Sequence, residues 1–135
     1  MITQDIDIRS ILSLSKTIAV VGASPKPWRD SGSIAQFLIG KGYKVYPVNP
    51  KYTVVLGEKC YPDLKSLPVQ IDIVDIFRKS EEVEAIIDEA IAIGAKVVWM
   101  QLGVVNSQAA AKAESAGMGV IMDRCIAIDH RALMR

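Results

Sequence analysis

Short apolar runs alternate along the chain with segments whose apolar residues recur at helical spacing. The runs are too continuous for strands that expose one face, and they suit a parallel sheet that helices cover on both sides. The strands predicted from these runs span residues 17–22, 43–48, 71–77, 95–102 and 119–122. Helices are predicted over residues 5–14, 33–41, 80–93, 106–117 and 129–134, with a short helix at 63–67 in an otherwise irregular stretch, 52–68.

Polar residues and a glycine mark the expected helix ends. Ser80 and Asn106 can cap two helices, because their side-chain oxygens accept hydrogen bonds from backbone N–H groups of the first turn. Gly42 is placed to end the helix before it in the left-handed conformation.

Alternating strands and helices predict right-handed crossovers and a parallel sheet. The expected fold class is α/β: a single Rossmann-like doubly wound domain over residues 1–135, with a five-stranded, mainly parallel sheet and helices on both faces. With the strands numbered along the chain, the expected order is 3-2-1-4-5. Ligands of such sheets bind beyond the carboxyl ends of the strands, where the order reverses. We therefore expect Ser24 and Gln101 to flank the binding crevice.

Composition limits the classes of protein to which this chain can belong. Its 135 residues suggest one domain, and half of them are hydrophobic, enough for one core. A net charge of +1 with scattered charges disfavours nucleic acid or an acidic membrane surface as partners. No apolar run approaches the roughly 20 residues of a membrane helix, and the N-terminus lacks the features of a signal peptide. Cys60 and Cys125 lack C-x-x-C spacing, so a cytoplasmic protein with reduced thiols is expected.

The stretch IAVVGASPKPWRDSGSIAQFL, residues 18–38, reads as a strand, a glycine, a loop and a helix. Ser24 and Pro27 stand where the dinucleotide fingerprint has its later glycines, so the motif is incomplete. Small residues permit a close backbone approach, and cations together with the helix N-terminus favour a phosphate. The candidate ligand-facing residues are Gly22, Ala23, Ser24, Lys26 and Arg29. The alternative is that Gly22 only shapes the turn and that both cations are solvated.

The second strand ends in Asn49, Pro50 and Lys51. NAD-binding domains have an acidic residue at this place, which bonds the ribose hydroxyls, so Asn49 disfavours NAD. Lys51 would suit a phosphate on that ribose, which NADP carries on its 2′ oxygen and coenzyme A on its 3′ oxygen. The alternative is a plain Asn-Pro turn.

The third and fourth strand ends add further candidates. Phe77 could pack on an adenine or fill the core, and Arg78 could pair with a phosphate or with an acidic residue of the next helix. Gln101 and Gly103 end the fourth strand above the expected crevice. A buried glutamine needs hydrogen-bond partners, and these could belong to a ligand or to a neighbouring loop.

The fifth strand end carries Arg124 and Cys125. A nearby cation could lower the pKa of the Cys125 thiol, and a thiol-bearing ligand could then form a mixed disulfide with it. The alternative is a small buried hydrophobic residue. His130 is the single histidine, and a surface or packing role is expected for it. The sequence contains no recognisable nucleophile set, Walker loop or metal-ligand spacing, so no catalytic or metal site is predicted.

Five motifs in chain order carry a resemblance to a known family: VGAS with a proline-containing loop and Ser31, then GYKVYPVNP, VDIFR, WMQLG and MDRC. Together they resemble the small stand-alone CoA-binding domain proteins of bacteria and archaea. The same Rossmann-like domain opens the alpha subunit of succinyl-CoA synthetase and related acyl-CoA synthetases. The resemblance spans about residues 17–130.

This resemblance implies coenzyme A, or an acyl-CoA, as the ligand. It puts Gly22, Ala23, Ser24 and the loop after them at the phosphates, Asn49, Pro50 and Lys51 near the adenosine, Phe77 and Arg78 beside the nucleotide, Gln101 and Gly103 along the pantetheine, and Arg124 and Cys125 near its far end. The synthetases use a phosphorylated histidine on a further domain, which this sequence does not contain. The implied role is therefore binding without turnover, as a CoA carrier, sensor or regulatory subunit.

Two other classes of function stay open at this point. One is an NADP-dependent reductase or a subunit of an acyl-CoA enzyme. The other is a protein-interaction module with a vestigial nucleotide pocket. The sequence does not decide whether the chain has a protein partner or forms a homo-oligomer.

Overall fold

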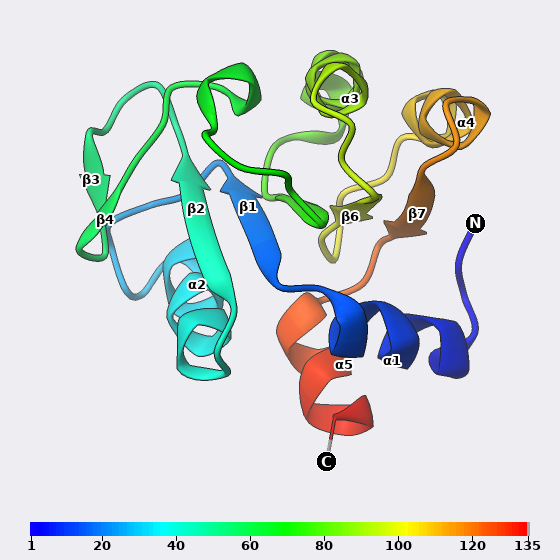
Figure 1. Cartoon of the computed structure of the whole chain (residues 1–135), viewed down its shortest axis with the longest axis horizontal. Helices are drawn as coiled ribbons and strands as arrows, with labels where there is room; N and C mark the ends of the chain where they lie inside the picture. Colours follow the sequence, from blue (N-terminus) through cyan, green and yellow to red (C-terminus); the bar gives the residue numbers. More distant parts are fainter. Residues whose placement is uncertain (135) are drawn as a thin grey trace.

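Five short parallel strands form the centre of the computed structural model, which describes residues 1–134 (Figure 1). The elements in chain order are α1 Asp5–Leu14, β1 Thr17–Val21, α2 Asp30–Gly40, β2 Lys44–Val48, β3 Val54–Val55, β4 Glu58–Lys59, the 3₁₀ turn η1 Leu64–Ser66, β5 Ile73–Ile76, the 3₁₀ turn η2 Ser80–Glu82, α3 Val83–Ala92, β6 Val97–Met100, α4 Ser107–Ser115, β7 Gly119–Met122 and α5 Ile126–Leu133. The α/β fold class is confirmed. The domain expected over 1–135 ends at Arg135, which lies outside the described residues.

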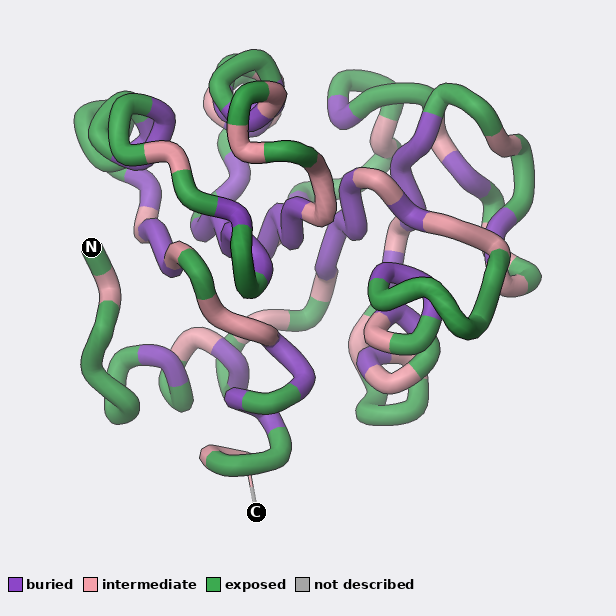
Figure 2. Tube along the Cα trace, turned by 180° about the vertical axis from the view of Figure 1, so that it is seen from behind, coloured by how far each residue is buried: buried purple, intermediate pink, exposed green. Residues whose placement is uncertain are grey.

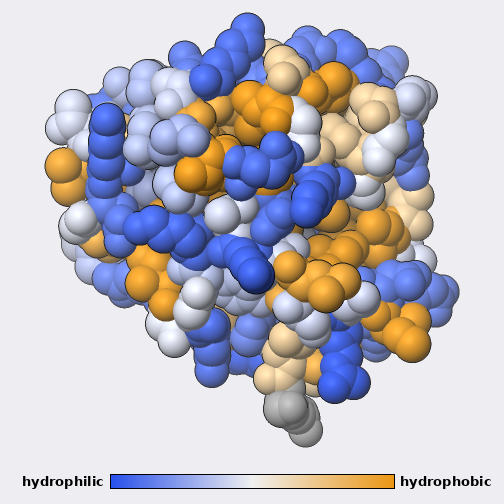
Figure 3. Space-filling view, in the orientation of Figure 1, coloured by the Kyte–Doolittle hydropathy of each residue, from blue (hydrophilic) through white to orange (hydrophobic). Residues whose placement is uncertain are grey.

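Helices cover both faces of the sheet. Helices α3 and α4 pack on one face, and α1, α2 and α5 pack on the other (Figure 1). Every residue of β5 and β6 is buried, as the continuous apolar runs predicted. Figure 2 shows the buried strands inside a mostly exposed outer layer, and Figure 3 shows apolar side chains interspersed with hydrophilic ones on the surface. None of the helices among residues 1–134 is both long and apolar enough to cross a membrane.

The predicted strand order is wrong. The observed order is β2-β1-β5-β6-β7, which is 2-1-3-4-5 in chain order rather than 3-2-1-4-5. The third strand of the chain therefore pairs with β1 and lies inside the sheet, and β2 is an outer strand. The order reverses between β1 and β5, so the loops that follow these two strands lie side by side.

The irregular stretch between β2 and β5 explains this order. It forms the β3–β4 hairpin and η1 instead of a crossover helix. Tyr61 from this stretch occupies the outer edge of β2, donating its N–H to the Pro47 carbonyl oxygen at 3.0 Å and accepting from the Asn49 N–H at 2.9 Å. Pro47 has no N–H for a ladder, which suits an edge strand and marks β2 as one.

The predicted helices match the observed ones with local differences. Helix α1 has the predicted bounds, and Asn106 caps α4 by accepting the Ala109 N–H at 2.9 Å. Ser80 is not a helix cap, because its hydroxyl accepts the Val105 N–H at 3.0 Å from the loop after β6. Helix α5 begins before the predicted start, at Ile126, and the β3–β4 hairpin was not predicted.

Asp75 is a carboxyl group inside the sheet. It is 0% exposed, and neither of its carboxyl oxygens has a hydrogen-bond partner among the described residues. It lies in register with Val20 and Trp99, whose side chains belong to the apolar layer facing α1, α2 and α5. Burial raises the pKa of Asp75 well above its usual value. The fold therefore favours the protonated, uncharged carboxyl.

The free energy of unfolding should depend on pH because Asp75 is protonated in the folded state. Because the pKa of Asp75 is raised in the folded state, its contribution to stability falls as pH rises from about 4, by up to about 1.4 kcal/mol per pH unit. Asp75→Asn removes this loss. The free energy of unfolding, measured in urea, should therefore increase in the variant relative to the native protein as pH rises. A constant difference across the range would contradict a protonated Asp75.

Asp72 provides a control of opposite sign. Burial alone would raise its pKa, but the N–H groups of Lys16 and Thr17 and the ammonium of Lys96 outweigh burial and lower it. Its contribution to stability is therefore present above the unfolded pKa and lost as pH falls. Asp72→Asn should lose stability relative to the native protein as pH rises from acid to neutral.

Candidate functional site

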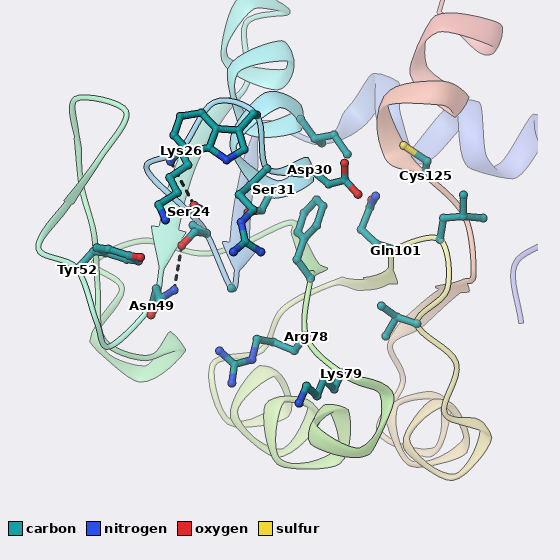
Figure 4. A pocket seen from close by; sticks show the side chains of 18 of the residues that line it. Ser24, Lys26, Asp30, Ser31, Asn49, Tyr52, Arg78, Lys79, Gln101 and Cys125 are labelled. Carbon is teal, nitrogen blue, oxygen red and sulfur yellow. Dashed lines mark hydrogen bonds between the residues drawn. The ribbon is translucent and has the colours of Figure 1, made fainter.

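A cavity of about 900 Å³ opens beyond the carboxyl ends of the strands (Figure 4). Ser24 and Gln101 both line it, but the order reverses between β1 and β5, so the loop after β5 and not Gln101 lies opposite Ser24 at the reversal. The predicted residues that line it are Gly22, Ala23, Ser24, Lys26, Arg29, Asn49, Lys51, Phe77, Arg78, Gln101 and Cys125. Five separate loops and helix starts thus bring most of the predicted residues to one place.

The loop after β1 packs closely against the loop after β5 and against the first turn of α2. Gly22 has φ +87°, and a Cβ there would lie 2.7 Å from the Phe77 carbonyl oxygen, so the loops after β1 and β5 touch through this glycine. Further along, Gly32 in the first turn of α2 packs against the loop, since a Cβ there would lie 2.3 Å from the Lys26 carbonyl oxygen. The first turn of α2 therefore packs directly against the loop at Gly32.

The start of α2 faces the cavity without a side-chain cap. Arg29 occupies the cap position and makes no side-chain hydrogen bond to the first turn. Asp30 and Ser31, the first residues of the helix, both line the cavity. An uncapped helix start presents backbone N–H groups and the positive end of the helix dipole, which together favour an anion.

Asn49 joins two of the ligand-facing loops. Its side-chain N–H donates to the Ala23 carbonyl oxygen at 2.9 Å (Figure 4). Its Oδ1 accepts the Lys51 N–H at 3.0 Å. The side chain is only 8% exposed. Asn49 thus fixes the loops after β1 and β2 relative to one another, a role that the Asn-Pro turn alone did not indicate.

Cations from three loops surround this part of the cavity. They are Lys26 and Arg29 after β1, Lys51 after β2, and Arg78 and Lys79 after β5. Arg78 donates through Nε to Glu82 Oε2 at 2.8 Å and forms a second contact to the same oxygen through Nη2. Of the two alternatives left open for Arg78, the pairing with an acidic residue is present, with Glu82 of η2, and the Arg78 side chain still borders the cavity.

Gln101 and Cys125 lie at the other side of the cavity (Figure 4). Gln101 is 5% exposed, and its Oε1 accepts the Ile126 N–H at 3.1 Å, which satisfies a free donor at the start of α5. This is the predicted structural hydrogen bond to a neighbouring segment. The amide end of Gln101 points toward Asp30. Cys125 is partly exposed, whereas burial raises the pKa of the Cys60 thiol.

Three predicted residues do not line this cavity: Pro50, Gly103 and Arg124. Pro50 lines a second cavity of about 410 Å³ beside α3. The Gly103 N–H donates to Asp123 Oδ1 at 2.7 Å, which joins the loops after β6 and β7. Arg124 binds both carboxylate oxygens of Asp129 at 2.7 and 2.9 Å.

His130 has the packing role expected for it. It is buried between the rings of Phe37 and Tyr43, with ring centroids 5.5 and 5.7 Å away. Burial, and after it the charge of Lys41, lowers the pKa of its imidazole. It does not line the cavity.

Several further residues line the cavity that were not among those predicted: Trp28, Asp30, Ile34, Tyr52, Lys79, Leu102, Val104 and Ile128. The sequence carried a signal for Trp28, because this aromatic residue lies between the cations Lys26 and Arg29 in the loop that starts at Gly22. In the fold its side chain is 75% exposed. Lys79 and Leu102 directly follow predicted residues at strand ends. Ile34 and Ile128 gave none, since they are apolar residues inside helices and read as core.

A family model described as a CoA-binding domain matches residues 16–131. The chain belongs to the CoA-binding domain family. The resemblance indicated by its strand-end motifs is therefore confirmed.

Relatives of this family occur alone and within larger enzymes. Uncharacterized protein YneT of Bacillus subtilis (strain 168) is 40% identical over 124 residues, 92% of this chain and 92% of that protein. A solved structure of a hypothetical protein from Pyrococcus horikoshii OT3 has a TM-score of 0.96 and 46% identity, covering 98% of this chain and 94% of that one. The ADP-forming acetate–CoA ligase I of Archaeoglobus fulgidus is 35% identical over 74 residues, 55% of this chain but 11% of the ligase.

Two glycines in α2 test how tightly the loop packs on the helix. Gly32→Ala should destabilise the protein by about 1–3 kcal/mol, because the new Cβ would meet the Lys26 backbone. Gly40→Ala in the same helix meets nothing within 4 Å and should stabilise by up to about 1 kcal/mol. Urea unfolding measures both. Equal effects at the two positions would show that the loop yields without cost.

Proposed function

We propose that this chain binds coenzyme A or an acyl-CoA in the 900 Å³ cavity, and that it acts as a CoA carrier, sensor or regulatory subunit without catalysing a reaction by itself. The observation that carries the proposal is the convergence of five cations and an uncapped helix start on one cavity, in a chain of the CoA-binding domain family. Coenzyme A carries three phosphates, so it needs such a concentration of positive charge.

The loops supply different contacts for different phosphates. The N-terminal end of α2, with Lys26 and Arg29, suits the pyrophosphate, since backbone N–H groups and side-chain cations are available together. Lys51 after β2 suits the 3′-phosphate of the ribose. Phe77 lines the cavity with partial exposure, so its ring is available to a ligand.

The lining residues support binding more than catalysis. The single histidine is packed in the core, and the buried amides of Asn49 and Gln101 already bond backbone groups. In the acetate–CoA ligase named above, the matched region is only 11% of the length, so most of that enzyme lies outside the part that resembles this chain.

Isothermal titration of the ligand-stripped protein tests the proposal. CoA should bind in the micromolar range, and NADP⁺ run beside it should give no heat. Heat of binding from NADP⁺ and none from CoA would overturn the proposal in favour of a reductase. No heat of binding from either ligand would favour an interaction module with a vestigial pocket.

A cation variant tests the contact to the 3′-phosphate. Lys51→Ala should weaken CoA about tenfold, the value of one charge-assisted contact, and should barely change the affinity for dephospho-CoA. Lys65→Ala is the matched control, because Lys65 is exposed and lines neither cavity. Equal losses for CoA and dephospho-CoA in Lys51→Ala would contradict a phosphate role.

Cys125 reports where the thiol end of the ligand lies. Incubation with CoA disulfide should transfer one CoA to Cys125 by thiol–disulfide exchange, releasing one CoA thiol, and mass spectrometry should find the adduct. Cys125→Ser should abolish it. Cys60 should stay unmodified, because it is buried and burial raises the pKa of its thiol. An adduct on Cys60 instead would show that the ligand lies differently.

A further inference from the structure

The two ends of the cavity differ in chemistry. The cations come from the loops after β1, β2 and β5. The lining residues that follow β6 and β7 are Gln101, Leu102, Val104, Cys125 and Ile128, and none of these carries a charge. Because the sheet order is β2-β1-β5-β6-β7, the cationic and uncharged sets are separated along the edge of the sheet.

The uncharged end presents apolar side chains to solvent. Leu102 is 66% exposed and Ile128 is 56% exposed, and both border the cavity together with the partly exposed Cys125. Val104 adds an almost fully buried apolar side chain to the same end. Apolar side chains that remain exposed beside a polar cavity are typical of a ligand contact.

The geometry of coenzyme A connects these two ends. With its phosphates among the cations over β2, β1 and β5, the pantetheine arm is directed toward β6 and β7. The distance from β1 to β7 is three strand spacings, roughly 14 Å. The sulfur, and any acyl group bonded to it, then lies at the apolar end.

We propose that the preferred ligand is a CoA thioester with a short, uncharged, apolar acyl chain, and that Leu102, Val104 and Ile128 contact this chain. The inference rests on the proposed CoA binding and adds the class of acyl group. A methylene that becomes fully buried against such side chains strengthens binding about fourfold. A terminal carboxylate would lose water without gaining a cation at this end, and Asp30 at the start of α2 would repel it.

Titrations with CoA, butyryl-CoA and succinyl-CoA test the proposal, since the last two acyl chains have equal length and differ in the terminal carboxylate. Butyryl-CoA should bind about tenfold more tightly than succinyl-CoA, and several-fold more tightly than CoA. Equal affinity for butyryl-CoA and succinyl-CoA, with CoA still bound, would overturn this inference and leave the proposed function intact. Failure of all three to bind would overturn the proposed function itself.

Variants in the loop after β6 test whether Leu102 contacts the acyl chain. Leu102→Ser should reduce the ratio of butyryl-CoA to succinyl-CoA affinity about threefold or more, and Leu102→Lys should reverse the preference by offering the carboxylate a cation. Val105→Ser is the matched control, because Val105 lies in the same loop, is 45% exposed and does not line the cavity. An equal loss of preference in Val105→Ser and Leu102→Ser would contradict the assigned contact.

Discussion

The pairing of β1 between β2 and β5 determines which loops can act on one ligand. Parallel strands end at the same edge of the sheet, and neighbouring strands lie only about 4.8 Å apart, so the loops after β2, β1 and β5 must share one small volume. Gly22 makes this crowding possible, since any larger residue would collide with the Phe77 backbone. This pairing gathers the cations of three loops in one part of the cavity, and the uncharged lining residues that follow β6 and β7 lie farther along the sheet edge.

Two buried amides hold the ligand-facing loops in place before any ligand arrives. Asn49 connects the loops after β1 and β2, and Gln101 connects the end of β6 to the start of α5. Each amide satisfies backbone groups that would otherwise be buried without partners. A cavity whose loops are already fixed loses less conformational entropy when it binds, which favours affinity for a long, flexible ligand.

Local patterns predicted the elements well and the strand order poorly. Apolar runs and caps such as Asn106 act over a few residues, so the sequence carries them directly. The order depends on whether the stretch 52–68 crosses the sheet or stays at its edge, and that stretch has little periodicity. Pro47 was the one available signal, because a strand with a missing N–H belongs at an edge. Most of the expected site residues line the one cavity because they were chosen as strand ends, which meet at the same edge of the sheet whatever the strand order.

Both outer strands of the sheet are already engaged within the chain. Tyr61 occupies the open side of β2, and the N–H of Ile2 donates to the Val120 carbonyl oxygen of β7 at 2.8 Å. Unpaired edges are the places where sheets from different molecules join and aggregate. A second molecule that tried to extend this sheet would first have to displace one of these segments, so the fold opposes fibre-like association while leaving the ligand cavity open.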